Sequence, residues 1–251
     1  WDPALRFSED ALRILRAFRF AAQLDFSIEP QTLETALRLA PSLRKISAER
    51  IFSELVRLLC SKAPSNAAEL FTSGALGFLG LAARADVSAL DALPNVREVR
   101  FAALCALCSR EPAPVCAALK ADNHLAKTAG ALYEMLLRPL PASDAEMKRR
   151  FAKLPPEYWE HLLSARAALF AEDVSAARGI LQKIAANAEP WKLSMLAVGG
   201  ADLQRLGLRG PEIGRTLEAL LRHVVQNPAD NQREILLGLI KGHKAEDKSR
   251  N

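Results

Sequence analysis

Residues 6–20 read RFSEDALRILRAFRF, and the rest of the chain is organised around this stretch. Ser8 is a typical N-cap residue, Glu9 and Asp10 place carboxylates in a first turn, and no Gly or Pro interrupts the residues after them. The stretch therefore predicts one continuous amphipathic helix. Its apolar residues, together with one in the next turn, share the face expected to meet the core: Ala11, Ile14, Leu15, Phe18 and Ala22.

The opposite face of this helix is cationic, because Arg13, Arg16 and Arg19 form a row with a spacing of three. Asp10 lies one turn before Arg13, so a carboxylate and a guanidinium would project side by side. Adenine and cytosine present an amino donor beside a ring-nitrogen acceptor, which suits this pair, whereas guanine and uracil present a carbonyl. Arg16 and Arg19 would then serve nucleotide phosphates. The alternative is an ordinary solvated salt bridge.

Composition favours an all-α fold. The chain has 251 residues, of which 50% are hydrophobic and only 6% aromatic, and it has no run of alternating β-branched residues. This length is enough for a sizeable core in two or three small helical units, and it excludes a disordered tail. The net charge of +5 and a pI near 9.2 favour an anionic partner such as RNA.

No apolar segment reaches the roughly 18 residues that a membrane span needs, and no signal-peptide pattern is present. We therefore expect a cytoplasmic protein that does not bind membranes.

The four cysteines do not suggest a disulfide framework in a chain of this length. Cys105, Cys108 and Cys116 could bind zinc together with His124, but the first two lie in the apolar run FAALCALC. We expect them to be buried hydrophobic residues, because free cysteine commonly behaves in this way.

Three segments resemble one known family in the same order and at similar separations. They are residues 6–24 (RFSEDALRILRAFRFAAQL), 26–33 (FSIEPQTL) and 46–55 (ISAERIFSEL). The first is similar to the neck signature of class II tRNA nucleotidyltransferases, which comprise the CCA-adding enzymes and bacterial poly(A) polymerases. The resemblance implies an elongated all-α arrangement with a neck at 1–62, a body at 63–140 and a tail at 141–251.

In that family the Glu-Asp-x-x-Arg motif is a protein template that selects CTP and ATP. Residue by residue, the resemblance assigns Asp10 and Arg13 to the base and Arg16 and Arg19 to further nucleotide contacts. It also makes the helix expected from Ala48 to about Cys60 a brace for the template. The alternative for that helix is an ordinary salt-bridged surface.

Residues 196–217 read LAVGGADLQRLGLRGPEIGRTL and are similar to the family's tail segment. Gly207 should end a short helix, and Pro211 should begin the next after a turn at Gly210. Backbone N–H groups at that turn, flanked by Arg209 and Arg215, would bind RNA phosphate. The alternative is a helix-turn-helix corner without a ligand.

Residues 147–153 (MKRRFAK) form a basic cluster, which we expect either to meet RNA phosphate or to be a solvated helix face.

The Gly-Ser pair and Asp-x-Asp motif with which the family's catalytic head holds triphosphate and two Mg²⁺ ions do not occur in this sequence. We therefore assign no catalytic residue to it and expect these 251 residues alone to be inactive. The resemblance implies a CCA-adding enzyme that uses CTP, ATP and tRNA. The alternatives are a poly(A) polymerase of the same family or a non-catalytic helical RNA-binding module.

Overall fold

The computed structural model describes the backbone of residues 2–151 and 153–249, and their side chains as far as residue 241. Throughout this part of the chain the regular elements are helices, and extended residues pair in a single bridge between Leu76 and Leu81. The predicted all-α class is confirmed. The chain divides into two compact units, Trp1–Pro139 with Glu157–Val174 (unit 1) and Leu140–Pro156 with Ser175–Asn251 (unit 2).

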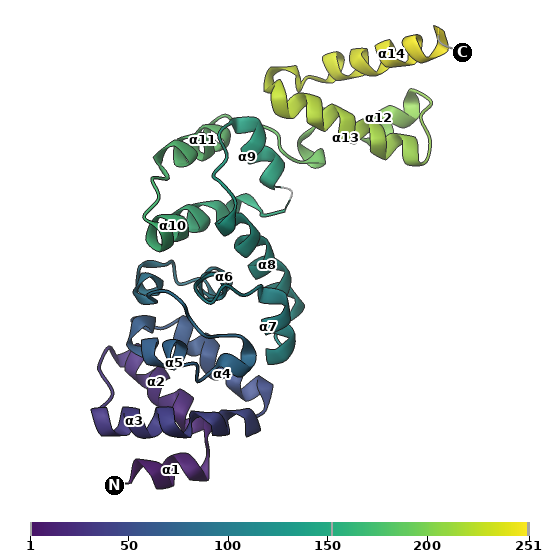
Figure 1. Ribbon diagram of the computed structural model, residues 1–251. Coiled ribbons are helices and arrows are strands. Elements are labelled where there is room, and N and C mark those ends of the chain that lie inside the picture. The colour runs from purple at the N-terminus through teal and green to yellow at the C-terminus, as the bar shows by residue number, and fades with distance from the viewer. Residues whose placement is uncertain (1, 152, 250–251) are drawn as a thin grey trace. The chain divides into compact units, whose positions relative to one another are not determined.

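The described residues of unit 1 form nine α-helices and four short 3₁₀ helices that lie wholly within it (Figure 1). The α-helices are α1 (Pro3–Glu9), α2 (Leu12–Leu24), α3 (Pro30–Leu39), α4 (Ala48–Leu59), α5 (Ala68–Thr72), α6 (Arg97–Leu107), α7 (Pro112–Leu119), α8 (Asn123–Leu137) and α10 (Trp159–Phe170). The 3₁₀ helices are η1 (Ala40–Lys45), η2 (Pro64–Ala67), η3 (Gly77–Leu79) and η4 (Ser88–Ala92).

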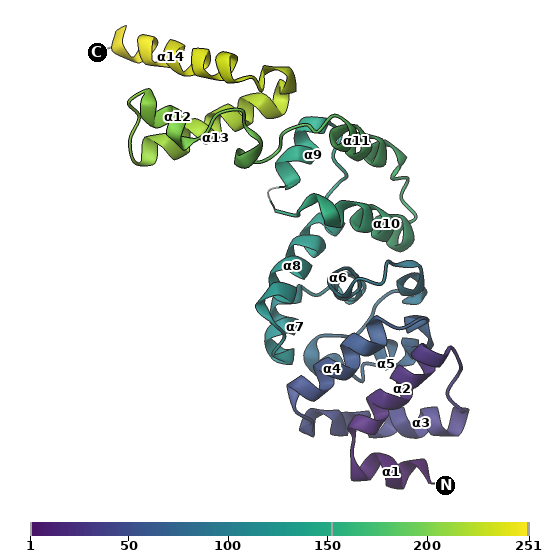
Figure 2. The same ribbon diagram turned by 180° about the vertical axis from the view of Figure 1, so that it is seen from behind.

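The core of unit 1 follows the apolar patterns of the sequence. The predicted inner face of α2 is buried, with Ile14, Phe18 and Ala22 fully enclosed where α2 packs against α4. Helix α6 is buried on almost every side and packs against α8, which lies beside it in Figure 2. These two helix pairs fix the position of the residues discussed below.

The prediction of one continuous helix over residues 6–20 is wrong. Helix α1 ends at Glu9, Asp10 is extended (φ −148°, ψ 107°), and α2 begins at Leu12. The Asp10 carboxylate accepts a hydrogen bond from the Leu12 N–H at 3.0 Å, which is the role of a capping residue. Ser8 is therefore not the N-cap of a long helix, and its hydroxyl donates to the Ala4 carbonyl at 2.7 Å.

A buried arginine ties three segments of unit 1 together. Arg100 of α6 is only 4% exposed, and its guanidinium donates to the carbonyls of Leu59, Ser61 and Leu93 at 2.6, 2.7 and 2.9 Å. Burial lowers the pKa of Arg100, but an arginine starts so high that it stays charged. These carbonyls lie at the end of α4 and just after η4. One side chain therefore supplies hydrogen-bond donors to the ends of both helices.

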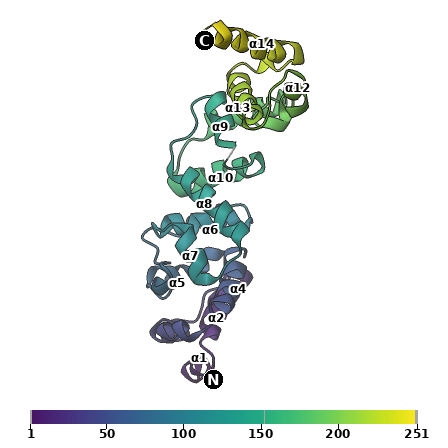
Figure 3. The ribbon, with the colours of Figure 1, turned by 90° about the vertical axis from the view of Figure 1, so that its right-hand side faces the viewer.

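Unit 2 holds α9 (Asp144–Phe151), α11 (Ser175–Ala186), η6 (Leu193–Met195), α12 (Gly200–Arg205), α13 (Pro211–Gln226), η7 (Pro228–Asp230) and α14 (Arg233–Ser249). Helices α12, α13 and α14 lie together in Figure 3 and share a core that includes Leu203, Leu208, Val224 and Leu236. The 3₁₀ helix η5 (Pro156–Tyr158) contains the boundary between the units.

Only part of the basic cluster at residues 147–153 is exposed: Arg149 and Lys153 are exposed, whereas Lys148 is buried. Lys148 is 1% exposed, and its ammonium pairs with Glu189 at 2.5 Å and donates to the Val225 carbonyl at 3.2 Å. Lys148 therefore joins α9 to the end of α13 and is unavailable to RNA. Periodicity could not show this, because Glu189 lies far along the chain.

The predicted division into neck, body and tail remains a prediction. The two units are defined by compactness, whereas the three predicted domains are defined by function. Its boundary near residue 140 coincides with the start of unit 2. Helix α10, which we expected in the tail, packs instead on α6 and α8 within unit 1. Arg166 makes this link by donating to the Met135 and Leu136 carbonyls at the end of α8, at 3.1 and 2.6 Å.

Among the described residues no single helix is long and apolar enough to cross a membrane. Helices α6 and α7 pass that test only when taken as a pair, and they are bent by 113° relative to each other.

We predict that Arg100→Ala destabilises the protein by about 3 kcal/mol, because several buried carbonyls lose their donor. Arg100→Lys should recover only part of this loss, since an ammonium cannot span the same carbonyls. The measurement is the urea unfolding midpoint. The exposed Arg84 serves as the control, and Arg84→Ala should stay within about 0.5 kcal/mol of the parent. Equal effects at both positions would contradict the role of Arg100.

Candidate functional site

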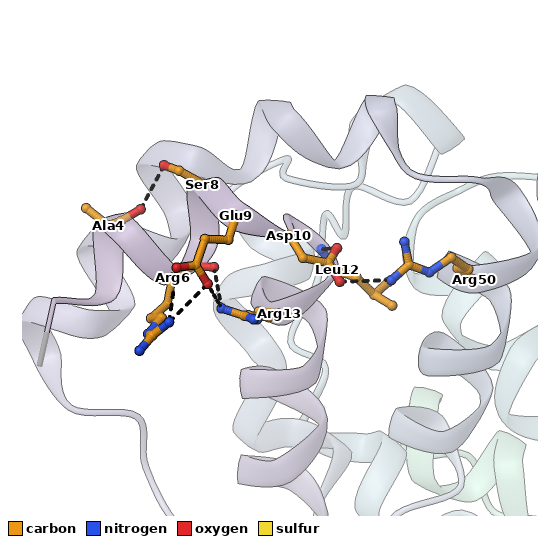
Figure 4. A network of polar contacts seen from close by, with 8 residues as sticks. All are labelled: Ala4, Arg6, Ser8, Glu9, Asp10, Leu12, Arg13 and Arg50. Atoms are coloured by element: carbon orange, nitrogen blue, oxygen red, sulfur yellow. Dashed lines mark hydrogen bonds and ion pairs between the residues drawn. The ribbon is translucent and has the colours of Figure 1, made fainter.

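The break between α1 and α2 gathers charged side chains from three helices. Asp10 at the break pairs with Arg50 of α4 at 2.8 Å, while Arg13 of α2 pairs with Glu9 at 2.5 Å (Figure 4). Arg6 completes the group with a 3.0 Å contact to Glu9. Asp10 and Arg13 therefore lie at the same break, but each pairs with a different residue, and their joint contact with a base stays a prediction.

The Asp10 carboxylate is an ionised hydrogen-bond acceptor. Burial works to raise the pKa of Asp10, but the Leu12 N–H and the Arg50 guanidinium outweigh it, and the pKa lies below the usual value. The carboxylate is therefore ionised at neutral pH and can accept further hydrogen bonds. With 28% of its side chain exposed, Asp10 can be reached by a ligand.

Arg13 is partly engaged and partly open. One of its terminal nitrogens donates to Glu9 and to the Arg6 carbonyl, at 2.5 and 3.2 Å. Hydrogen bonds from Arg13 and Arg6 lower the pKa of Glu9, so this carboxylate also remains ionised. The side chain of Arg13 is 40% exposed, and a guanidinium has five N–H donors, which leaves others for a ligand.

Arg16 and Arg19 converge on one buried carboxylate. Glu54 of α4 is 5% exposed and accepts from Arg19 at 2.6 Å and more loosely from Arg16 at 3.4 Å. Arg19 also donates to Gln23 at 2.6 Å and lies 3.9 Å from the ring centroid of Phe20. Arg19 is thus occupied within the protein, whereas Arg16 is 47% exposed and better placed to meet an anion.

Glu9, Arg50 and Glu54 were not among the site residues predicted from the sequence. Arg50 and Glu54 are four residues apart on α4, so they project from the same side of that helix. Arg50 reaches Asp10 at the break and Glu54 reaches α2, as expected of a brace. The spacing of Arg50 and Glu54 indicated a polar face on α4. Only the packing of α4 beside α2 could show which residues these two side chains contact.

The second predicted site lies at the turn before α13. Gly207 and Gly210 have positive φ angles of 82° and 53°, and Pro211 begins the helix, as the sequence predicted. Arg209, Gly210 and Arg215 are all exposed. Glu212 in the first turn of α13 is exposed as well, and its charge opposes an anion there.

Two polar residues tie α12 and the segment before it to the residues around the start of α14. Asp202 of α12 accepts from Arg233 at 2.6 Å and from the Gly199 N–H at 2.9 Å. Asn231 accepts from the Ala197 N–H and donates to the Met195 carbonyl, both at 2.9 Å. Asn231 thus acts as a clip within unit 2.

The cysteines are not brought together as a metal site. Cys105, Cys108 and Cys116 are buried, and burial raises the pKa of the Cys116 thiol to about 11. His124 has 66% of its side chain exposed. In the described part of the chain, no group of three or more His, Cys, Asp or Glu residues could hold a metal ion.

Comparison with known proteins places these features in a family. Residues 25–79 match the family model described as "Probable RNA and SrmB- binding site of polymerase A". The CCA-adding enzyme of Streptococcus gordonii is 32% identical over 96% of this chain and 62% of its own length. That of Streptococcus suis is 63% identical over 23% of this chain and 14% of its own.

A solved structure agrees across the whole chain. The crystal structure of the Bacillus stearothermophilus CCA-adding enzyme in complex with CTP aligns with a TM-score of 0.76 and 27% identity. The alignment covers 99% of this chain and 65% of that one. This chain is similar to the CCA-adding enzyme and poly(A) polymerase family over nearly its whole length. It spans about three fifths of the length of the CCA-adding enzymes that it matches end to end, such as the 62% covered in Streptococcus gordonii.

We predict that Glu54→Gln destabilises the protein by roughly 1–3 kcal/mol, because Arg19 and Arg16 lose their shared carboxylate near the core. The partial exposure of Arg16 keeps the effect below that of a fully buried pair. Urea unfolding measures the change. Glu34→Gln, at an exposed position of α3, is the matched control and should have almost no effect. A loss no larger than in the control would contradict the bracing role.

We also predict that Asp202 makes stability sensitive to acid. Hydrogen bonds from Arg233 and from the Gly199 N–H lower the pKa of Asp202. The ionised Asp202 therefore stabilises the folded protein at pH values well above its pKa in the unfolded chain, which is about 4. This contribution is lost as the pH falls through the lower pKa of the folded state. Between about pH 6 and pH 3, Asp202→Asn should lose less stability than the parent. Arg233→Gln should flatten the same part of the profile, and parallel profiles for all three proteins would contradict this assignment.

Proposed function

We propose that this chain is the nucleotide-selecting and RNA-binding part of a CCA-adding tRNA nucleotidyltransferase. The observation that carries the proposal is that an ionised Asp10 and a partly exposed Arg13 both lie at the break between α1 and α2. Similarity to the family supports it, as does the solved structure of a relative in complex with CTP. We assign phosphoryl transfer itself to a part of the protein outside these 251 residues.

In this proposal Asp10 and Arg13 select the base. Asp10 would accept the exocyclic amino hydrogen of cytosine or adenine, and Arg13 would donate to the adjacent ring nitrogen. A guanine or uracil would place its carbonyl against the Asp10 carboxylate, and two acceptors repel each other. The pair thus admits both correct bases with one geometry.

Selection would require Arg13 to leave its resting contact with Glu9, whereas Asp10 can stay in place. Asp10 can keep its bonds to Leu12 and Arg50 while accepting another, because a carboxylate has about four acceptor positions. Arg13 can turn from Glu9 towards the base, since its side chain is 40% exposed. The contacts to Glu9 and Arg50 would therefore hold the two side chains near their working positions before a nucleotide arrives.

Charge supports a triphosphate next to this pair. Arg6, Arg13, Arg16, Arg19 and Arg50 face three carboxylates, so the surroundings keep an excess of positive charge. We assign the phosphates chiefly to Arg16, whose 3.4 Å contact with Glu54 is longer than a strong hydrogen bond. Arg19 would mainly position Arg16 through their common partner Glu54.

For the tRNA partner we propose contacts at the turn before α13. Arg209 and Arg215 would pair with phosphates, and the Gly210 turn would let the RNA backbone approach closely. Such contacts suit A-form RNA, which proteins recognise mainly through backbone and 2′-hydroxyl groups.

The family resemblance also implies Mg²⁺. The described residues do not fit this role, because no group of three or more candidate ligands is present among them. We therefore route no step through Mg²⁺ in this chain and leave it to the part that transfers the phosphoryl group.

A poly(A) polymerase is the second candidate, because the family model that matches residues 25–79 is described by reference to polymerase A. Such an enzyme would use ATP without adding C. A non-catalytic RNA-binding module is the third candidate, and it would add neither nucleotide.

We predict that the full-length protein adds C and then A to tRNA lacking its CCA end, with CTP, ATP, GTP and UTP tested separately. Asp10→Asn offers an amide donor to carbonyls, so it should lower discrimination against G and U by about tenfold or more. Asp86→Asn, at an exposed aspartate outside the site, is the matched control and should keep the parent's selectivity.

Other outcomes distinguish the candidates. Runs of A without C would favour a poly(A) polymerase, and no incorporation would favour the binding module. Unchanged selectivity in Asp10→Asn would remove Asp10 from the template. The 251-residue chain by itself should incorporate nothing, and detectable CMP addition by it would contradict our division of labour.

A further inference from the structure

A small pocket in unit 1 lies outside the sites described above. It has a volume of about 160 Å³ and forms between residues 37–44 and 73–78, with Leu37, Pro41, Arg44, Ser73, Gly74 and Phe78 in its wall. All of these residues lie within the segment 25–79 that matches the RNA-binding family model. That match names a segment and leaves open which residues contact RNA.

Two turns present the pocket's main side chains. Arg44 follows Leu43, which is fully buried in η1, and Phe78 precedes Leu79, which is 8% exposed in η3. Gly74 has φ +78°, a conformation that other residues rarely adopt, and its carbonyl accepts from the Gly77 N–H at 2.8 Å. The buried leucines thus fix the turns while Arg44 stays exposed and Phe78 half-buried.

The Arg44 guanidinium lies 5.6 Å from the centroid of the Phe78 ring. Direct stacking contact needs about 3.5–4.0 Å, and a planar ring between the two groups needs about twice that distance. An outward swing of Arg44 by about 1.5–2.5 Å would therefore admit a flat ring. An aromatic face opposed by a guanidinium is the arrangement with which proteins hold an unstacked RNA base.

The charge around the pocket also suits RNA. Arg38, Arg44 and Lys45 are exposed, and within the described part of the chain none of them has an ion pair. The arginines at the α1–α2 break are, by contrast, each paired with a carboxylate. Glu34 and Glu69 belong to the same region of unit 1, but neither lines the pocket.

We propose that this pocket binds one unpaired nucleotide of RNA. Its base stacks on Phe78 and beneath Arg44, and its phosphate meets the cations of η1. The inference rests on the proposed function, which supplies the RNA, and it extends that function to a contact site that Asp10, Arg13 and the α13 turn do not include.

The test measures binding of the full-length protein to a single-stranded RNA that carries a fluorescent adenine analogue, whose emission falls when it stacks. Phe78→Ala should weaken binding about fivefold to a hundredfold and abolish the quenching, since one stacked base is lost. Phe78→Leu should retain part of the affinity and little of the quenching. It also keeps the test valid if Phe78→Ala does not fold.

Arg44→Ala should weaken binding and reduce the slope of log affinity against log salt by about one, as expected for one lost phosphate contact. Arg44→Lys should restore the slope but not the quenching, because a lysine is charged but not planar. Arg57→Ala removes another exposed cation of the same matched segment, one that does not line the pocket. This control should change affinity less than twofold.

The inference is overturned if the Phe78 and Arg44 variants bind RNA and quench like Arg57→Ala, which is also the result expected if the pocket serves a protein partner. Nucleotide addition, measured in parallel, separates this inference from the proposed function. Normal C and A addition with unaltered RNA binding in the variants would reject the pocket alone. Weakened binding in the variants of a protein that adds no nucleotide would reject the function and keep the pocket.

Discussion

The arrangement of the candidate nucleotide site depends on one buried carboxylate. Glu54 is 5% exposed where α4 packs against α2, and a charge in that position is stable only if it is paired. Arg19 and Arg16 provide the pairing. The apolar side of α2 faces the core, and Glu54 must be paired with arginines of α2. Together these two constraints fix the rotation of the helix about its axis and hence the direction of its cationic row. Arg50, one turn earlier on α4, then meets Asp10.

Buried guanidinium groups solve a related problem elsewhere in the fold. Arg100 and Arg166 donate to backbone carbonyls near helix ends, where helical hydrogen bonding leaves acceptors without donors. A chain of short helices has many such ends, and their carbonyls need hydrogen-bond donors from elsewhere in the fold. Arginine is suited to this role because its planar group carries five donors and stays charged when buried.

Two cationic surfaces of unit 1 differ in how their charges are balanced. At the α1–α2 break, carboxylates hold the arginines in defined directions, which favours discrimination between ligands. Around Arg44, the cations have no such partners among the described residues, which favours attraction of a phosphate chain over selectivity. A protein that must select a nucleotide and also hold RNA needs both kinds of surface.

The sequence by itself determined the helical class, the resemblance to a family and the bounds of a few helices, such as α4 and the start of α13. The buried face of α2 and the Gly210–Pro211 turn followed from local periodicity and from backbone preferences of Gly and Pro, which act over a few residues. The sequence also selected Asp10 and Arg13 as a candidate pair. It did not reveal the break at Asp10, because Ser8, Glu9 and Asp10 match a helix start as well as they match the junction that forms.

Only the tertiary structure decided the partners. The bonds from Arg50 to Asp10, from Arg19 to Glu54 and from Lys148 to Glu189 join residues at least 35 positions apart. The burial of Lys148 and the approach of Arg44 to Phe78 depend on such long-range packing as well. Local sequence reports which face of a helix is polar. Whether a charge on that face meets solvent, a ligand or another charge depends on which distant segment packs against it.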